Sequence, residues 1–302
     1  MGAQAEIAVN AQNLLGEGII WSAAHGEAQW VDIFGKLFWI FDPSKGVAKS
    51  IALPERLACF APLGGSRLLA GFASGLAYFD LASGAREDIA AIEADLPSTR
   101  LNDGKLDRQG RLVFGTMDED NPAQPIGRVW SFDGGAPRIL FDGVRISNSI
   151  AFSPDGRRMY FADTPQGVIW RYDYDVDTGD ASNRQIFVEA ARDHGYPDGS
   201  TVDADGCLWN AKWGGGRVVR YTPEGRLDRV VAIPCSQATC CAFGGADLST
   251  LFVTSARVGL SEAKLAAEPE AGAMFAIHVG VRGLIDAPAG NSFDSAASGP
   301  QV

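Results

Sequence analysis

The segment RLVFGTMDEDNPAQPIGRVWSFD, residues 111–133, contains a short apolar strand and, after a polar loop, a second strand. The second strand, GRVWSFD (127–133), opens on glycine, alternates apolar and polar residues, and closes on an aromatic residue and an aspartate. Alternation with a period of two residues is typical of half-buried β-strands. This pair of strands is the unit that organises the rest of the chain.

Six copies of the unit run along the sequence. The second strand recurs in segments such as GKLFWIFD (35–42) and GVIWRYD (167–173), and is weakest in GAMFAIH (272–278). Turns such as PSKG and DVDTG place Pro, Asp and Gly where tight hairpins need them. The first strand recurs at intervals of 39 to 49 residues, centred in turn on Trp30, Leu69, Val113, Tyr160, Trp209 and Phe252.

Antiparallel units repeated every roughly 40–50 residues have the spacing of propeller blades. A β-sandwich or a solenoid would not repeat this regularly over the whole chain. We therefore predict an all-β fold, a six-bladed β-propeller with four antiparallel strands in each blade. No linker or charge block divides the sequence, so we expect one domain over residues 1–302.

The two ends of the chain bear on how the ring closes. An open ring would expose two sheet edges, so we expect AEIAV (5–9) to form a strand that completes the last blade. KLAAEPEAG (264–272) lies in the longest insertion, where we expect a short helical turn. Residues 287–302 are small and polar, and we expect them to form a flexible tail.

The composition disfavours several classes of protein. Asp and Glu number 37 against 26 Lys and Arg, and the net charge of -11 disfavours nucleic acid and membrane surfaces as partners. The start, MGAQAEIAVN, has no basic or apolar signal region. Five cysteines without a CxxC spacing argue against a disulfide framework, and three scattered histidines argue against a His-rich zinc site. We therefore expect a cytoplasmic protein, and the sequence carries no signal for a particular oligomeric state.

Polar residues stand near the start of four inner strands, where a strand needs no charge. They occur in LGEG (15–18), RLNDGK (100–105), ISNS (146–149) and YPDGS (196–200). Asn-Asp-Gly and Pro-Asp-Gly also form ordinary turns, which is the alternative explanation. Their shared position within the repeat instead predicts that four side chains point toward the channel axis, namely Glu17, Asn102, Asn148 and Asp198.

Two carboxylates with amide oxygens form a set of hard oxygen donors. Such a set is typical of a divalent cation site for Ca²⁺, Mg²⁺ or Mn²⁺. The polar candidates at this mouth, which also include Arg100, Asp103 and Lys212, are mostly hydrogen-bonding groups. This polarity favours a polyhydroxylated ligand over an aryl ester.

Three long segments resemble the senescence marker protein/gluconolactonase family, also called the regucalcin family. They are RLNDGKLDRQGRLVFGTMD (100–118), ISNSIAFSPDGRRMYFADT (146–164) and YPDGSTVDADGCLW (196–209). The similarity extends over nearly all of the chain, from Leu15 to Arg257, and bacterial sugar lactonases look most similar. The resemblance implies a six-bladed propeller with one catalytic divalent metal ion in the channel mouth.

The resemblance also implies roles for individual residues. The metal-binding positions of the family fall on Glu17, Asn148 and Asp198. Its substrate-binding positions fall on Arg100 and Asn102 and, in a neighbourhood that departs from the family pattern, on Asp120. The family usually has glycine where this chain has Ser149, a change that removes no ligand. Family metals include Ca²⁺, Zn²⁺, Mn²⁺, Mg²⁺ and Fe²⁺, so the resemblance does not identify the ion.

These assignments predict metal-dependent hydrolysis of a sugar lactone to its aldonic acid. The ion would polarise the lactone carbonyl and activate a water, with Asp198 or Asp103 as the catalytic general base. Arg100 and Asn102 would hold the sugar hydroxyls. Two alternatives stay open: a metal-dependent phosphotriesterase or arylesterase-like hydrolase, and a non-catalytic calcium-binding or protein-interaction propeller. An assay panel of lactones and esters separates them.

Overall fold

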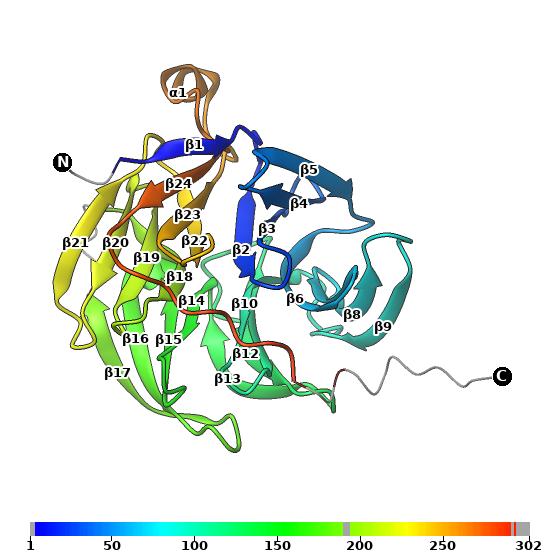
Figure 1. Cartoon of the computed structure of the whole chain (residues 1–302). Coiled ribbons are helices and arrows are strands. Elements are labelled where there is room, and N and C mark those ends of the chain that lie inside the picture. The colour runs from blue at the N-terminus through cyan, green and yellow to red at the C-terminus, as the bar shows by residue number, and fades with distance from the viewer. Residues whose placement is uncertain (1–3, 190–193, 291–292, 294–302) are drawn as a thin grey trace.

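The computed structural model describes residues 4–189, 194–290 and 293, which form six four-stranded antiparallel sheets arranged as blades around a channel (Figure 1). The first blade consists of β2 (Gly16–Ser22), β3 (Glu27–Asp32), β4 (Leu37–Asp42) and β5 (Val47–Ala52). The second consists of β6 (Leu57–Gly64), β7 (Arg67–Phe72), β8 (Gly75–Asp80) and β9 (Arg86–Ala91). The third consists of β10 (Thr99–Leu106), β11 (Leu112–Asp118), β12 (Gly127–Phe132) and β13 (Arg138–Val144).

The remaining blades continue the same order around the ring. The fourth consists of β14 (Ser147–Phe152), β15 (Arg158–Asp163), β16 (Val168–Tyr174) and β17 (Ala181–Glu189). The fifth consists of β18 (Tyr196–Val202), β19 (Leu208–Trp213), β20 (Arg217–Tyr221) and β21 (Leu227–Ala232). The last contains β22 (Ala238–Gly244), β23 (Thr250–Ser255) and β24 (Met274–His278).

The ring closes through the start of the chain. Strand β1 (Glu6–Val9) pairs antiparallel with β24, so the last sheet has the order β1-β24-β23-β22. This pairing gives the last blade its fourth strand and confirms the expectation for residues 5–9. The predicted six-bladed propeller is likewise confirmed.

Helix is nearly absent from the described residues. The insertion before β24 contains α1 (Glu262–Ala267), and a short 3₁₀ turn, η1 (Thr164–Gln166), follows β15. The helical turn expected within residues 264–272 therefore begins slightly earlier. Among the helices that the structure describes, none has the length and apolar character to cross a membrane.

The core lies between neighbouring blades. The repeat positions identified in the sequence are all buried there, on the second strand of each blade: Trp30, Leu69, Val113, Tyr160, Trp209 and Phe252. Burial of a large side chain removes apolar area from water at about 25 cal/mol per Å², which is why this position is apolar in every blade. The repeat in the sequence therefore arises because every blade buries an apolar residue at the same structural position.

Each inner strand contains an irregularity near its start. In β2 the pairing passes from Glu17↔Val31 to Ile20↔Gln29, which leaves one extra residue in the inner strand. Register shifts occur at similar places in β6, β10, β14, β18 and β22. A β-bulge bends the strand and re-aims its side chains. These bulges therefore change the direction of side chains at one level of the channel.

The end of the chain crosses one face of the ring (Figure 1). Arg108 donates to the Ile285 carbonyl, and the Gly290 amide donates to the Gly110 carbonyl. Phe293 is buried, with its ring centroid 5.5 Å from that of Phe132. Within the expected flexible tail, Gly290 and Phe293 therefore make contacts with the third blade. Residues 291–292 and 294–302 of that tail lie outside the described residues.

Candidate active site

A cavity of about 250 Å³ lies where the inner strands β2, β10, β14 and β18 begin. Its polar lining consists of Glu17, Arg100, Asn102, Asn148, Thr164 and Asp198. Its apolar lining consists of Leu15, Phe34, Met117, Ile146, Trp213 and Val258. The structure thus brings together the predicted metal ligands and two of the predicted substrate contacts. The apolar half of the lining was not predicted from the sequence.

Two of the lining groups are buried carboxylates, with Glu17 8% exposed and Asp198 4% exposed. Burial, and then the negative charge of Asp103, raises the pKa of Glu17 to about 8. Burial, and then the charge of Glu17, raises the pKa of Asp198 well above its usual range. Neither carboxyl group forms an ion pair within the described residues, since Arg100 pairs with Glu119 and Lys105 pairs with Asp286.

The third predicted ligand is an amide whose orientation is fixed. Asn148 Nδ2 donates to Thr164 Oγ1 at 2.8 Å. The Asn148 Oδ1 atom consequently faces the other way, where Asn102 Nδ2 lies at 3.5 Å. Thr164 Oγ1 also donates to the Pro197 carbonyl at 3.0 Å, which links two blades beside the site. Thr164 was missed because a threonine after a strand gives no distinctive signal in a sequence.

These three side chains fit a divalent cation. All their donor atoms are oxygen, which hard cations prefer, and two of them are buried carboxyl groups that form no ion pair with a lysine or arginine of the described residues. Among the described residues no group of three or more His, Cys, Asp or Glu forms a metal cluster. A cation at this cavity would therefore use the Asn148 amide oxygen alongside Glu17 and Asp198, with the remaining positions open to water or substrate.

Arg100 is held on three sides. Its Nε donates to Glu119 Oε1 at 3.0 Å, and its Nη1 donates to the Leu101 carbonyl and to Asn102 Oδ1, each at 2.8 Å. Its guanidinium carbon lies 5.8 Å from the centroid of the Phe34 ring. Burial lowers the pKa of Arg100, an effect that Glu119 opposes. The Nη2 atom forms no hydrogen bond within the described part of the chain, so it remains available to a ligand.

Glu119 is a further residue that the sequence did not reveal. It accepts hydrogen bonds from both Arg56 and Arg100, so one carboxylate fixes two guanidinium groups beside the cavity. Its neighbour Asp120, the predicted substrate contact, is exposed and does not line the cavity. Glu119 directly follows the last residue of β11, which directs its side chain back toward Arg100. Its position in the acidic run DEDNP was the available signal.

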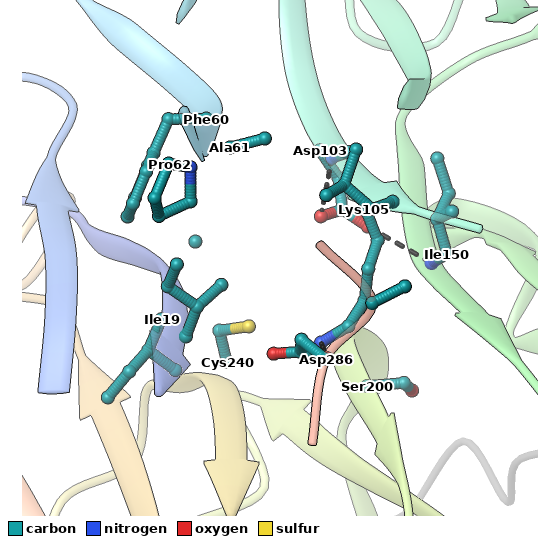
Figure 2. A pocket seen from close by; sticks show the side chains of 15 residues that line it. Ile19, Phe60, Ala61, Pro62, Asp103, Lys105, Ile150, Ser200, Cys240 and Asp286 are labelled. Atoms are coloured by element: carbon teal, nitrogen blue, oxygen red, sulfur yellow. Dashed lines mark hydrogen bonds and ion pairs between the residues drawn. The ribbon is translucent and has the colours of Figure 1, made fainter. Parts of the chain in front are cut away.

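Asp103 is not part of the lining of the cavity. It lines a second pocket of about 40 Å³, together with Lys105, Ser200 and Asp286, and Figure 2 shows these side chains around it. Its carboxylate accepts from the amides of Gly104 at 2.8 Å and Ile150 at 3.1 Å. Burial raises the pKa of Asp103 to about 6. Asp103 therefore acts on the cavity through its charge and does not line it.

Lys212 also departs from its expected place at the mouth. Its side chain is buried, with Nζ 5.3 Å from the centroid of the Tyr221 ring and without a hydrogen-bond partner in the described structure. Burial lowers the pKa of Lys212 to about 7. The next residue, Trp213, lines the cavity instead. Successive side chains of a strand point to opposite faces. An error of one residue in the predicted position therefore places Lys212 at the cavity, where Trp213 in fact lies.

The chain as a whole is similar to known proteins. A family model described as the SMP-30/gluconolactonase/LRE-like region matches residues 15–257. The chain belongs to this family. That match covers most of the chain, includes the strands that bear Glu17, Asn148 and Asp198, and confirms the family predicted from the sequence.

Individual members of the family are similar over almost their full length. The chain is 43% identical over 276 residues to an L-arabinolactonase from Azospirillum brasilense, which covers 90% of this chain and 91% of that protein. It is 34% identical over 280 residues to a 6-deoxy-6-sulfogluconolactonase from Pseudomonas putida, which covers 92% of this chain and 96% of that protein. The crystal structure of regucalcin, a calcium-binding protein from Agrobacterium tumefaciens, matches with a TM-score of 0.90 and 34% identity, covering 95% of this chain and 97% of that one.

Proposed function

We propose that this chain is a metal-dependent lactonase that opens a sugar lactone of five or six carbons to the aldonic acid. The observation that carries the proposal is the convergence of Glu17, Asn148 and Asp198 on one cavity, where the two buried carboxyl groups form no ion pair with a basic side chain of the described residues. The names of the relatives from Azospirillum brasilense and Pseudomonas putida support a sugar lactone as substrate. The calcium-binding regucalcin of the same fold supports a divalent ion.

Glu17, Asn148 and Asp198 would hold the ion. When bound there, a divalent ion supplies Lewis-acid polarisation of a carbonyl and lowers the pKa of a coordinated water. Asp198 lines the cavity whereas Asp103 does not, so we assign the general base to Asp198. It would take a proton from the attacking water as the new carbon–oxygen bond forms. The ring carbon–oxygen bond then breaks, and the released alkoxide takes up a proton to give the open hydroxy acid.

Arg100 would bind and orient the lactone. Its Nη2 atom is the one donor of the guanidinium that the described residues leave unused. Asn102 keeps Arg100 in place through its Oδ1 and donates through Nδ2 to the Ser147 carbonyl at 2.9 Å. Phe34 and Trp213 form apolar wall on the same cavity, which suits the carbon–hydrogen faces of a small ring. Polar groups on one side and aromatic groups on the other fit a compact, hydroxylated ester.

A substrate panel tests this proposal. Pentono- and hexonolactones should be hydrolysed with kcat/KM at least about 100-fold above that of γ-butyrolactone, because a ligand without hydroxyls leaves polar groups of the site unpaired. Initial rates with the metal-loaded protein measure this ratio. Equal efficiency on γ-butyrolactone would contradict sugar recognition by Arg100 and Asn102. Faster turnover of a phosphotriester or aryl ester than of any lactone would favour the other hydrolase class.

The cysteines support a proposal for the cellular compartment of the protein. All five cysteines are free and buried. Unpaired thiols at this number are typical of a reducing compartment. We therefore keep the cytoplasmic location as part of the proposal.

A further inference from the structure

Each strand that bears a proposed metal ligand receives a side-chain hydrogen bond from the neighbouring blade. The donor belongs in every case to an adjacent inner strand, and the acceptor is a backbone carbonyl at the ligand or directly before it. The three bonds run from Thr239 Oγ1 to the Gly16 carbonyl at 2.5 Å, from Asn102 Nδ2 to the Ser147 carbonyl at 2.9 Å, and from Ser149 Oγ to the Asp198 carbonyl at 2.5 Å.

The Asp198 carbonyl shows why such a donor is needed. The pairing of β18 with β19 passes from Pro197↔Lys212 to Ser200↔Asn210, so Asp198 lies within the bulge and outside the regular ladder. Its carbonyl instead accepts from Ser149 Oγ and from Asn210 Nδ2, the latter at 2.9 Å. A buried carbonyl must be satisfied by some donor. The bulge that aims Asp198 is therefore fixed by side chains.

The backbone conformation of Ser149 is strained, which also indicates that its side chain helps to fix the bulge. Its φ is 60°, in the left-handed region that favours glycine, and the residue is fully buried. Its hydroxyl donates to Asp198 and accepts from Asn210 Nδ2 at 3.0 Å. A glycine would avoid the strain but would lose both bonds. The two hydrogen bonds of its hydroxyl thus explain why a serine occupies this strained position.

Thr239 makes the corresponding link at the other carboxylate. It is fully buried on β22, next to β2, and its hydroxyl also lies 2.9 Å from Thr254 Oγ1. The carbonyl to which it donates belongs to Gly16, the residue before Glu17. Neither Thr239 nor Ser149 lines the cavity. Any effect of Thr239 on a bound ion must therefore pass through Glu17, and any effect of Ser149 through Asp198 or through its chain neighbour Asn148.

We propose that Ser149 and Thr239 are positioning residues that hold Asp198 and Glu17 in the geometry of the cation site. The proposal rests on the proposed function, because it takes Glu17 and Asp198 as metal ligands. Groups that orient metal ligands from outside the coordination sphere typically contribute about 10- to 100-fold to metal affinity. Two hydroxyls in different blades are accordingly expected to influence one ion, although neither touches it.

The test measures cation affinity directly on metal-stripped protein. Isothermal calorimetry with Ca²⁺, Mn²⁺ and Zn²⁺ on the wild type first identifies the ion that binds most tightly, which is then used throughout. Ser149→Ala and Thr239→Val should each raise the dissociation constant about 10- to 100-fold. Thr239→Ser keeps the hydroxyl and should stay within about threefold of the wild type. Ser149→Gly removes both the hydroxyl and the strain, and should bind as weakly as Ser149→Ala.

Ser255→Ala is the matched control. Ser255 is fully buried and donates to the Ala273 carbonyl at 2.7 Å, but Ala273 belongs to no ligand-bearing strand. This variant should bind the ion like the wild type. Circular dichroism of every variant shows whether the ring is folded, and Ser149→Gly serves if Ser149→Ala does not fold. Wild-type affinity in folded Ser149→Gly and Thr239→Val would overturn the positioning role alone, whereas a wild type that binds none of the three ions would overturn the proposed metal site as well.

Discussion

Asp198→Ala should lower kcat/KM for a sugar lactone by at least about 1,000-fold, because it removes a metal ligand and the proposed general base together. The variant should also retain no divalent ion after gel filtration. The ring should remain folded, since burial and the charge of Glu17 raise the pKa of Asp198 and its removal relieves that repulsion. Steady-state kinetics, elemental metal analysis and circular dichroism measure the three expectations.

Asp177→Ala is the control for this change. Asp177 is an exposed aspartate in the turn between β16 and β17, away from the cavity. Its replacement should leave kcat/KM and metal content within about twofold of the wild type, as for surface substitutions in general. Normal turnover by Asp198→Ala would show that Asp198 is neither ligand nor base.

Arg100→Ala should lower kcat/KM for sugar lactones by about 100-fold or more, since it removes the guanidinium that binds and orients the substrate. The divalent ion should stay bound, because Arg100 donates to Glu119, Leu101 and Asn102 and to none of the proposed ligands. The loss should be smaller with γ-butyrolactone, which offers no hydroxyls. Kinetics on both substrates and metal analysis check these points.

Arg157→Ala provides the matched comparison for Arg100. Arg157 is exposed and does not line the cavity, so its replacement should change neither kinetic constant by more than about twofold. Should Arg100→Ala reduce the rates on both lactones equally, its role would be general to ester hydrolysis and not specific to hydroxyl recognition. Full activity with sugar lactones would remove Arg100 from the site.

The repeat made the fold predictable. Trp30 and Trp209 lie at the same packing position in different blades, so a six-fold pattern of apolar residues was visible without any structure. The polar exceptions Glu17, Asn148 and Asp198 were visible for the same reason, because they depart from that pattern at equivalent places. A polar residue that interrupts a regular apolar repeat can be recognised in a single sequence.

The finer placement of side chains was not predictable, and the differences are mostly of one residue. Lys212 was expected at the mouth where Trp213 lies, and Glu119 rather than Asp120 holds Arg100. Side chains alternate between faces along a strand, and a single bulge reverses the alternation. Lys212 lies on β19 and Glu119 directly follows β11, so an error of one residue in either segment exchanges the face on which the side chain lies.

Contacts between blades form the other class of features that the sequence did not show. Ser149 and Asp198 are 49 residues apart in the chain, yet their hydrogen bond joins two inner strands. Thr239 and Gly16 are separated by 223 residues and meet only because the ring closes. No local pattern records such a pairing, which depends on how neighbouring blades are rotated against each other.

The central claim is that hydrolysis depends on an ion held by Glu17, Asn148 and Asp198, and reconstitution tests it most directly. Metal-stripped protein should be inactive toward pentono- and hexonolactones. Stoichiometric addition of single divalent ions should restore activity with one ion per chain, and the dissociation constant from calorimetry should match the concentration that restores half of the activity. Full lactonase activity in the metal-stripped protein, with no gain from any divalent ion, would contradict the account.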